Sequence, residues 1–227
     1  EVNINGIKNL VTQLKDTEIK LIYISTKDVY GNIFNKNNIV ETEKYYKLPY
    51  FVDDDHPFYP QTAYGKSKLI GEYMAECHSN HIIIRLSSCY TNYDHYRGHW
   101  VPNLMKSAIS GSKIKITNKG KQVRDLLHVN DLGRLINLIL KSNKKGIKIN
   151  VGGGEKNIFS ILQFLELIDS NSNISYFQGN DYGFVFSNKT VKKEFAWEPE
   201  ILFRESIAII KKNLTKGISG INKIIGN

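Results

Sequence analysis

The stretch TAYGKSKLIGEYMAECHSNHIIIRL, residues 62–86, decides the fold class, because it predicts a helix followed directly by a strand. Thr62 is a suitable N-cap, and an apolar stripe at helical spacing follows it at Ala63, Ile70, Met74 and Cys77. Residues 81–86, HIIIRL, form the short apolar run that is typical of a buried strand.

The same alternation extends in both directions along the chain. We expect helices at about 3–16 and 100–110, from Asp131, from the capping box at Ser160, and around 203–214. We expect strands at 19–25, 113–117, 121–127 and 147–151, and polar loops at 27–60 and 87–99. Alternating strands and helices pair in parallel through right-handed crossovers, so the sequence predicts an α/β fold.

The composition excludes several classes of protein. The chain has 227 residues, 41% of them hydrophobic, which is enough for one buried core, or for one domain with an added lobe. No apolar run is long enough to span a membrane, and no secretory signal is recognised at the start. The two cysteines, Cys77 and Cys89, form neither a disulfide framework nor a Cys-rich metal site. We therefore expect a cytoplasmic protein without a metal and with no membrane partner.

The net charge of +9, from 31 Lys and Arg against 22 Asp and Glu, allows two interpretations. Nucleic-acid binding is one of them. The positive residues are spread along the chain, however, and Lys, Asn and Ile are all abundant, so we do not favour a nucleic-acid partner. A small anionic substrate would also be attracted by this charge.

Tyr64 and Lys68 are four residues apart on the predicted helix and therefore lie on the same face. A phenol has a pKa of about 10, and a nearby ammonium group lowers that value. The pair could thus provide a proton acceptor near neutral pH. The alternative is an ordinary amphipathic helix in which the spacing has no function.

Five segments, in this order, resemble the extended short-chain dehydrogenase/reductases, and among them the NAD-dependent nucleotide-sugar epimerases and dehydratases. The segments are NINGIKNL (3–10), YISTKDVYG (23–31), YGKSKLIGE (64–72), GKQVRDLLHVND (120–131), and NVGGG (150–154) with SNKTVKKEFAWEP (187–199). The resemblance covers nearly the whole chain and favours a catalytic role for Tyr64 and Lys68.

The resemblance implies the second half of a doubly wound, Rossmann-type parallel sheet with a small mixed C-terminal substrate-binding lobe. Residues 1–90 and 128–152 would belong to the dinucleotide-binding domain, and residues 91–127 and 153–227 to the part that binds the nucleotide sugar. The Gly-rich loop of the family's first half is not in this sequence. We therefore expect either a natural protein longer by on the order of 100 residues or a truncated relative. The 227-residue chain alone should bind NAD weakly and be inactive.

By the same resemblance, Tyr64 would remove a proton from a sugar hydroxyl, and Thr26 would hydrogen-bond the sugar oxygen. Lys68 would lower the pKa of Tyr64 and hold the cofactor ribose, so Ser25, Tyr64 and Lys68 are the expected NAD-binding residues. Thr26 could instead serve only to complete a turn at the end of the strand.

Ser88 and Arg124 are the expected substrate-binding residues, with Arg124 as a bidentate ligand of the diphosphate. The alternative for Arg124 is an ion pair with Asp125 or another local acid. Many relatives have Asn where this chain has Ser88, which leaves the identity of the substrate open.

Three details resemble the CDP-sugar 2-epimerases of the paratose-to-tyvelose type. They are Ser88-Cys89-Tyr90, Gly98-His99-Trp100-Val101 and GKQVRDLLH at 120–128. Dehydratases of the family place an Asp-Glu pair after the Thr, whereas this chain has Lys27-Asp28, which argues against a 4,6-dehydratase.

The expected reaction is therefore epimerisation of a nucleotide-diphosphate sugar, by transient oxidation of a ring carbon and return of the hydride. The alternatives are an NAD(P)H-dependent reductase or dehydratase, and a catalytically silent relative that binds a nucleotide or RNA. The sugar, the reacting carbon and the choice between NAD and NADP remain open. We also expect a homodimer formed through the helices at 3–16 and 62–77, to which Leu10, Leu14, Met74 and Cys77 could contribute.

Overall fold

The computed structural model describes residues 2–92, 100–168 and 172–225, with the side chains of the last helix described up to residue 214. The helices are α1 (Val2–Gln13), α2 (Ala63–Glu76), α3 (Trp100–Ile109), α4 (Val129–Lys141), α5 (Ile161–Leu167), α6 (Lys189–Phe195) and α7 (Phe203–Ile225). The longer strands are β1 (Leu21–Thr26), β4 (His81–Leu86), β6 (Ile114–Thr117), β7 (Val123–His128), β8 (Ile147–Val151) and β10 (Ile174–Phe177). The shorter strands are β2 (Val40–Glu41), β3 (Tyr46–Lys47), β5 (Ser88–Tyr90), β9 (Ile158–Ser160) and β11 (Gly183–Phe184).

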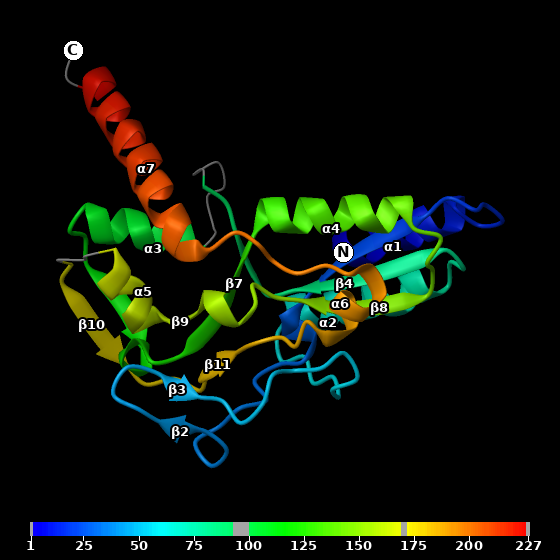
Figure 1. Cartoon of the computed structure of the whole chain (residues 1–227), viewed down its shortest axis with the longest axis horizontal. Helices are drawn as coiled ribbons and strands as arrows, with labels where there is room; N and C mark the ends of the chain where they lie inside the picture. Colours follow the sequence, from blue (N-terminus) through cyan, green and yellow to red (C-terminus); the bar gives the residue numbers. More distant parts are fainter. Residues whose placement is uncertain (1, 93–99, 169–171, 226–227) are drawn as a thin grey trace.

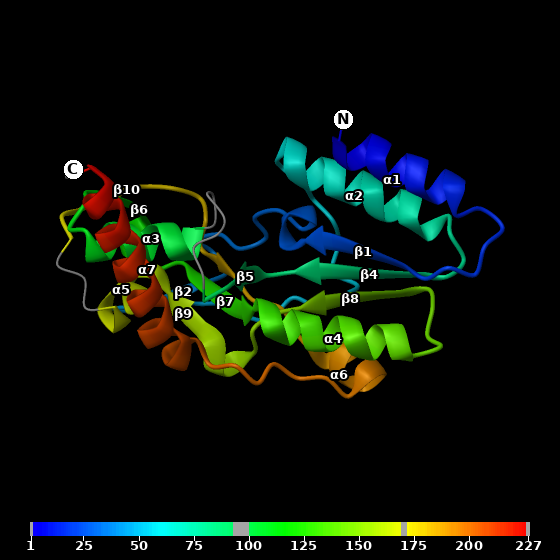
Figure 2. The ribbon, with the colours of Figure 1, turned by 90° about the horizontal axis from the view of Figure 1, so that it is seen from above.

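A parallel sheet in the order β1-β4-β8 organises the first half of the molecule. Helices α1 and α2 cover one face of the sheet, and α4 and α6 cover the other (Figure 2). Within the described part of the chain β1 pairs with β4 alone, so β1 is an edge strand. This arrangement confirms the predicted α/β fold with parallel pairing.

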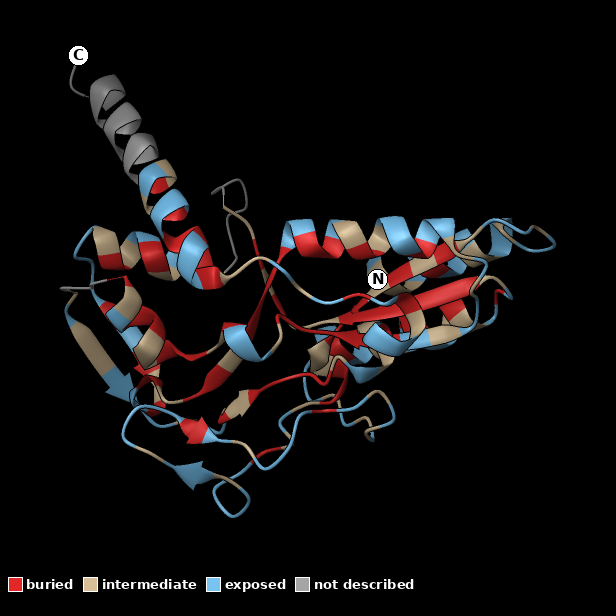
Figure 3. Ribbon diagram, viewed as in Figure 1, coloured by how far each residue is buried: buried red, intermediate tan, exposed pale blue. Residues whose placement is uncertain are grey.

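Strand β4 is central because its side chains fill the cores on both faces. Ile83 packs with Ile7 of α1 and Ala75 of α2, whereas its neighbours Ile82 and Ile84 pack against α4. Successive side chains of a strand point to opposite faces, so a strand covered on both sides must be apolar throughout. Figure 3 shows the resulting buried strands between exposed helix surfaces.

The second part of the molecule is a mixed lobe (Figure 1). Strand β7 pairs in parallel with β5 and β11 and antiparallel with β9, while β6 pairs with β10. Helices α3, α5 and α7 enclose its apolar core, in which Phe164 stacks on Phe203. The division of the chain into two parts remains a prediction, and the packing departs from it at one place. Residues 191–197 pack on the α4 side of the sheet, although they follow the lobe in sequence.

The segment 27–60, predicted as a polar loop, is partly ordered by contacts with the lobe. It contains the hairpin β2–β3, whose Tyr46 ring packs edge-on against Tyr182. The backbone N–H of Tyr46 donates to the Lys121 carbonyl at 2.8 Å, and the Ser160 hydroxyl donates to the Lys44 carbonyl at 2.7 Å. Strands β5, β9, β10 and β11 and helix α6 were also not predicted, and Gly98 and His99 lie outside the described residues.

The apolar stripe of α2 does not lie in the core as a whole, because Ala63, Ile70 and Cys77 are exposed. The buried residues of α2 are Gly65, Gly71, Glu72 and Ala75. The small residues let the helix backbone approach β1 closely, since a Cβ at Gly71 would lie 2.0 Å from the Tyr23 hydroxyl oxygen.

The residues proposed for a dimer interface divide into two groups. Leu14 and Met74 pack against the core between α1 and α2, whereas Leu10 and Cys77 are exposed. The homodimer therefore stays a prediction. Of the four residues proposed for its interface, only Leu10 and Cys77 are exposed and could contact a second copy.

Asp125 of β7 is fully buried where the lobe meets the sheet. Its Oδ2 accepts a hydrogen bond from the Phe186 N–H at 3.1 Å, and Oδ1 has no partner among the described residues. Gly152 passes so close that a Cβ there would lie 1.9 Å from Oδ2. Burial raises the pKa of the Asp125 carboxyl from 3.8 to about 7, since a charged carboxylate is costly in an apolar surrounding.

We predict that Gly71→Ala destabilises the protein by roughly 2 kcal/mol, because the new methyl group would overlap the Tyr23 hydroxyl. Gly133→Ala is the matched control: Gly133 is also helical, but its Cβ would meet nothing within 4 Å. The control should gain about 0.5–1 kcal/mol from helix propensity alone. Urea denaturation measures both changes, and a Gly71→Ala protein as stable as the control would contradict the close packing of α2.

We also predict that Asp125 makes stability fall with rising pH. The folded chain keeps a proton on this carboxyl that the unfolded chain releases, so the stabilisation is complete below pH 3.8 and is lost as pH rises to about 7. Asp125 lowers the free energy of unfolding by at most about 1.4 kcal/mol for each unit by which the pH rises in this range. Urea denaturation between pH 4 and 8 should show a flatter profile for Asp125→Asn than for the unmodified chain, and parallel profiles would contradict the shifted pKa.

Candidate functional site

Thr26 and Tyr64 meet at the carboxyl end of β1. Thr26 is the last residue of that strand, and its hydroxyl lies close enough to the Tyr64 phenol to lower the pKa of that phenol. The Asp28 N–H donates to the same Thr26 oxygen at 3.3 Å and so fixes the hydroxyl's position. Tyr64 lies in the first turn of α2, which begins after the N-cap Thr62, and half of its surface is exposed. The structure therefore brings together two of the three predicted catalytic side chains.

Lys68 lies one turn further along α2, but its ammonium group does not point at the Tyr64 phenol. Its Nζ is 4.4 Å from the centroid of the Tyr23 ring, a cation–π contact. Burial lowers the pKa of Lys68, and the Glu72 carboxylate opposes that effect.

The predicted lowering of the Tyr64 pKa by Lys68 is not observed in this arrangement. Burial and the nearby Asp28 carboxylate raise the pKa of Tyr64, and the nearby Thr26 hydroxyl lowers it only in part. The physical reason is the placement of the Lys68 ammonium over the ring of Tyr23.

Ser25 was predicted to bind the cofactor, and its hydroxyl is instead engaged inside the protein. Ser25 is buried and donates a 2.5 Å hydrogen bond to Oε1 of Glu72. Arg85 of β4 binds the same carboxylate in a bidentate way, with Nη2 2.8 Å and Nε 3.0 Å from Oε2. The side chains of Glu72 and Arg85 are each 1% exposed.

This polar network continues from Arg85 toward the lobe. Arg85 Nη1 donates to the Tyr30 hydroxyl at 2.8 Å and to the Asp54 carbonyl at 3.0 Å. Tyr30 in turn donates to Oδ1 of Asn150 at 2.8 Å. The network therefore joins α2, β4, β8 and the segment that follows β1.

Lys27 and Asp28 form an ion pair beside Thr26, with Nζ 2.9 Å from Oδ1. The Lys27 ammonium also lies 5.5 Å from the centroid of Phe184 in β11, the residue aligned with Arg124 on the neighbouring strand. Lys27 therefore reaches from the end of the sheet toward the lobe.

Arg124 lies in the lobe, in an ion pair with Asp181. The alternative expectation of an ion pair is thus what the structure shows, but the partner is the distant Asp181 and not Asp125 or another local acid. Arg124 also lines a cavity of about 550 Å³ together with Trp100, Asn103 and Gln122. Oε1 of Gln122 is buried and has no partner among the described residues.

Ser88 starts β5 and is buried. It is aligned with Leu126 of β7, two residues beyond Arg124, so Ser88 and Arg124 lie on neighbouring strands. It is not among the residues that line the 550 Å³ cavity.

Glu72, Arg85 and Asp181 are the site residues that the sequence analysis missed. Glu72 carried a signal, because it follows Lys68 by four residues and so falls on the same face of the helix. Arg85 also carried a signal, because it is a charged residue in the predicted strand 81–86. The other residues of that strand are apolar, except for His81 at its start. Asp181 had no such signal, since its pairing with Arg124 joins segments 57 residues apart.

In the part of the chain that the structure describes, no helix is both long and apolar enough to cross a membrane. Nor do the described residues contain a group of three or more His, Cys, Asp and Glu side chains placed to hold a metal ion.

Known proteins match most of the length of this chain. One curated relative is the dTDP-glucose 4,6-dehydratase of Xanthomonas campestris pv. campestris, which is 25% identical over 228 residues. The match includes 91% of this chain and 61% of that protein, so the chain spans about three fifths of the relative's length.

Solved structures agree with the fold. The dTDP-glucose 4,6-dehydratase of Bacillus anthracis in complex with NAD matches with a TM-score of 0.77 and 25% identity, over 94% of this chain and 67% of that one. The UDP-glucuronic acid 4-epimerase of Bacillus cereus, in complex with UDP-glucuronic acid and NAD, matches with a TM-score of 0.75 and 22% identity over the same shares.

Residues 1–152 match the model of the NAD dependent epimerase/dehydratase family, and they include Thr26, Tyr64, Lys68 and Arg124. This match covers about two thirds of the chain and contains both the strand and the helix that form the candidate site. The chain therefore belongs to the NAD-dependent epimerase/dehydratase family.

Proposed function

We propose that this chain carries the catalytic side chains of an enzyme that epimerises a nucleotide-diphosphate sugar with NAD as a resident cofactor. The observation that carries the proposal is the proximity of the Thr26 hydroxyl and the Tyr64 phenol at the carboxyl end of β1, with Lys68 one helical turn away. Ligands of open α/β sheets bind at the carboxyl ends of the strands, where this group lies.

The roles of the residues follow from their chemistry. The Thr26 hydroxyl can orient a sugar hydroxyl beside the Tyr64 phenol, and the phenolate of Tyr64 can accept its proton. The pKa of Tyr64 must fall for this step, since burial and Asp28 hold it above its ordinary value. Lys68 can supply the lowering if its ammonium moves from the Tyr23 ring toward Tyr64.

One observation supports a place for NAD beside these residues. The Lys68 ammonium makes no hydrogen bond or ion pair within the described ranges, so its three donors are free to hold ribose hydroxyls. When bound, NAD supplies the hydride chemistry at a ring carbon. Ser25 fits less well, because its buried hydroxyl already donates to Glu72.

The substrate part of the proposal rests on Arg124 and the cavity beside it. A volume of about 550 Å³ lies within the usual range of ligand sites, and the Arg124 guanidinium can bind a diphosphate bidentately. The diphosphate would compete with Asp181 for this guanidinium. The net charge of +9 favours the approach of such an anion.

A dehydratase is the second candidate, because several relatives carry that name. The ion pair of Lys27 with Asp28 favours the epimerase. A lysine beside Thr26 cannot replace the carboxylic acid that would protonate a leaving hydroxyl. The resemblance to CDP-sugar 2-epimerases remains a prediction, and a reductase remains the third candidate.

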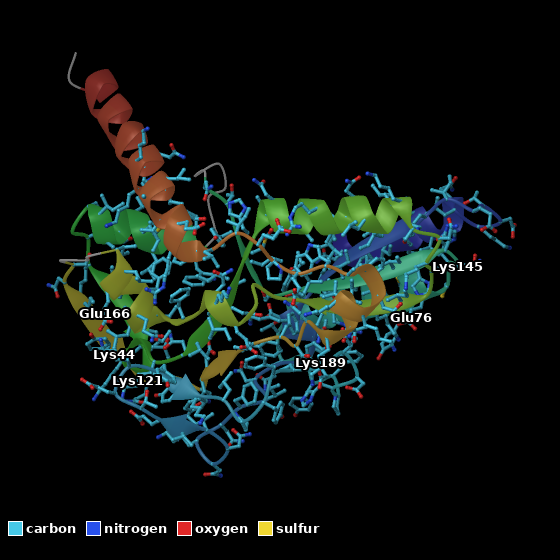
Figure 4. All side chains as sticks on the ribbon, viewed as in Figure 1. Lys44, Glu76, Lys121, Lys145, Glu166 and Lys189 are labelled. Carbon is cyan, nitrogen blue, oxygen red and sulfur yellow. The ribbon has the colours of Figure 1, made fainter. Side chains whose placement is uncertain are left out.

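A silent RNA-binding relative is less well supported, because several lysines are paired with acids; Figure 4 labels Lys44 and its partner Glu166. The pairs are Lys44–Glu166, Lys121–Glu41, Lys144–Glu194, Lys148–Glu76 and Lys192–Glu198. Such mixed charge differs from the single-signed face that binds a phosphate backbone.

We predict that Tyr64→Phe lowers kcat by about 10²–10⁴-fold, because it removes the proton acceptor. The affinity for NAD should stay nearly unchanged, since the ring and Lys68 remain. The measurements are steady-state kinetics and calorimetry on the protein at its natural length. Tyr73→Phe on the same helix is the control, because Tyr73 is exposed. Equal kinetic losses in the two variants would contradict the role of Tyr64.

The reaction itself can be tested with UDP-, CDP- and dTDP-sugars in deuterated water, followed by NMR. We expect an epimer to form without added reductant and without solvent deuterium in the ring, because the hydride removed from the ring is returned to it. Product that appears only in proportion to added NAD(P)H would identify a reductase. Loss of a hydroxyl group from the sugar would identify a dehydratase.

A further inference from the structure

Lys27 and Arg124 are two cations that approach the same place from different parts of the molecule. Lys27 follows Thr26 at the carboxyl end of β1, and its ammonium lies 5.5 Å from the centroid of the Phe184 ring in the lobe. Phe184 of β11 is aligned with Arg124 of β7 in a parallel pair. Aligned residues of paired strands project to the same face, and such strands lie about 4.8 Å apart. The Lys27 ammonium therefore lies over a ring that is the immediate neighbour of the Arg124 side chain.

The Asp181 carboxylate shows that both cations act on an anion at this place. Asp181 precedes β11, the strand of Phe184, and forms an ion pair with Arg124. Burial raises the pKa of Asp181, but the charges of Arg124 and Lys27 outweigh burial and hold that pKa below its usual value. An anionic group of a ligand that took the place of this carboxylate would meet the same two positive charges.

Each of the two cations is paired with an acid that a ligand can displace. The Lys27 Nζ lies 2.9 Å from Oδ1 of Asp28, and the two side chains are 27% and 36% exposed. Asp181, the partner of Arg124, has a side chain that is 42% exposed. Ion pairs that face water contribute little stability, so a ligand with two negative charges can compete for both cations.

We propose that Lys27 is a substrate-binding residue, which binds the diphosphate together with Arg124 and contacts the phosphate nearer to the sugar. This inference rests on the proposed function, in which the sugar lies beside Thr26 and Tyr64. Lys27 is the residue after Thr26, so its ammonium is the cation on the sugar side, whereas Arg124 lines the cavity in the lobe. One cation for each phosphate group matches the charge of a diphosphate.

The test compares nucleoside diphosphates with monophosphates, by calorimetry on the protein at its natural length with NAD bound. CDP, UDP and dTDP are titrated alongside CMP, UMP and dTMP, so that the contribution of the second phosphate is measured for each base. Lys27→Met should weaken the binding of the diphosphates by about 10-fold or more, and that of the monophosphates by less than about twofold. Lys27→Arg keeps the positive charge and should retain most of the affinity for diphosphates.

Two controls separate the charge of Lys27 from other effects of its removal. Lys44→Met takes a lysine out of another ion pair, with Glu166 at 3.0 Å (Figure 4), and should leave all affinities unchanged. Lys27→Met combined with Asp28→Asn leaves no unpaired acid beside the ligand. This double variant should bind diphosphates as weakly as Lys27→Met alone. Recovery of the affinity would mean that the freed Asp28 carboxylate repels the ligand, and it would overturn the inference.

Equal diphosphate affinities in Lys27→Met and the unmodified protein would overturn the inference, as would an unmodified protein that binds none of the three diphosphates. A loss confined to UDP-glucuronate, with UDP and UDP-glucose unaffected, would assign Lys27 to a sugar carboxylate and would also overturn it. A diphosphate affinity that depends on Lys27, in a protein that turns over none of the nucleotide sugars, would support the inference and contradict the proposed function. The two conclusions can therefore fail separately.

Discussion

The buried pair of Glu72 and Arg85 is the constraint on which the site depends. Two opposite charges taken out of water cost several kcal/mol each unless every donor and acceptor is paired. Here the Glu72 carboxylate meets a bidentate guanidinium and the Ser25 hydroxyl, and the remaining Arg85 nitrogen meets Tyr30. A small shift of α2 along the sheet would break several of these bonds together. The pair therefore fixes the register of α2 against β1, which is what places Tyr64 beside Thr26.

The same network connects the sheet to the segment between β1 and α2. The Tyr30 hydroxyl accepts a hydrogen bond from Arg85 and donates one to Asn150 of β8. The Tyr30 ring packs among Phe58, Phe184 and Phe186. One side of Tyr30 is thus polar and the other belongs to an aromatic cluster shared with the lobe. The orientation of the lobe against the sheet, and with it the distance from Arg124 to Tyr64, is set partly through this residue.

The sequence predicted those features that local patterns encode. The apolar run of β4 and the capping box at Ser160 predicted two of the main elements, and the family resemblance implied that Tyr64 and Thr26 belong to one site. Strands β5, β9 and β11 were missed because each has two or three residues and exists through pairing with β7. The inner face of α2 was not predicted, because Gly71 and Glu72 stand there in place of the apolar residues that a helix usually buries. The placement of Lys68 over Tyr23 and the pairing of Arg124 with Asp181 depend on tertiary contacts that no spacing reveals.

The position of β1 at the edge of the sheet has a consequence for handling the molecule. Its sequence, LIYIST, carries no charge, proline or glycine, and the described residues leave one side of its backbone unpaired. Such an edge can add a strand from another chain, and natural proteins usually block it with charges or cover it. The exposed backbone groups of β1 would therefore make the chain prone to aggregate by strand pairing at this edge.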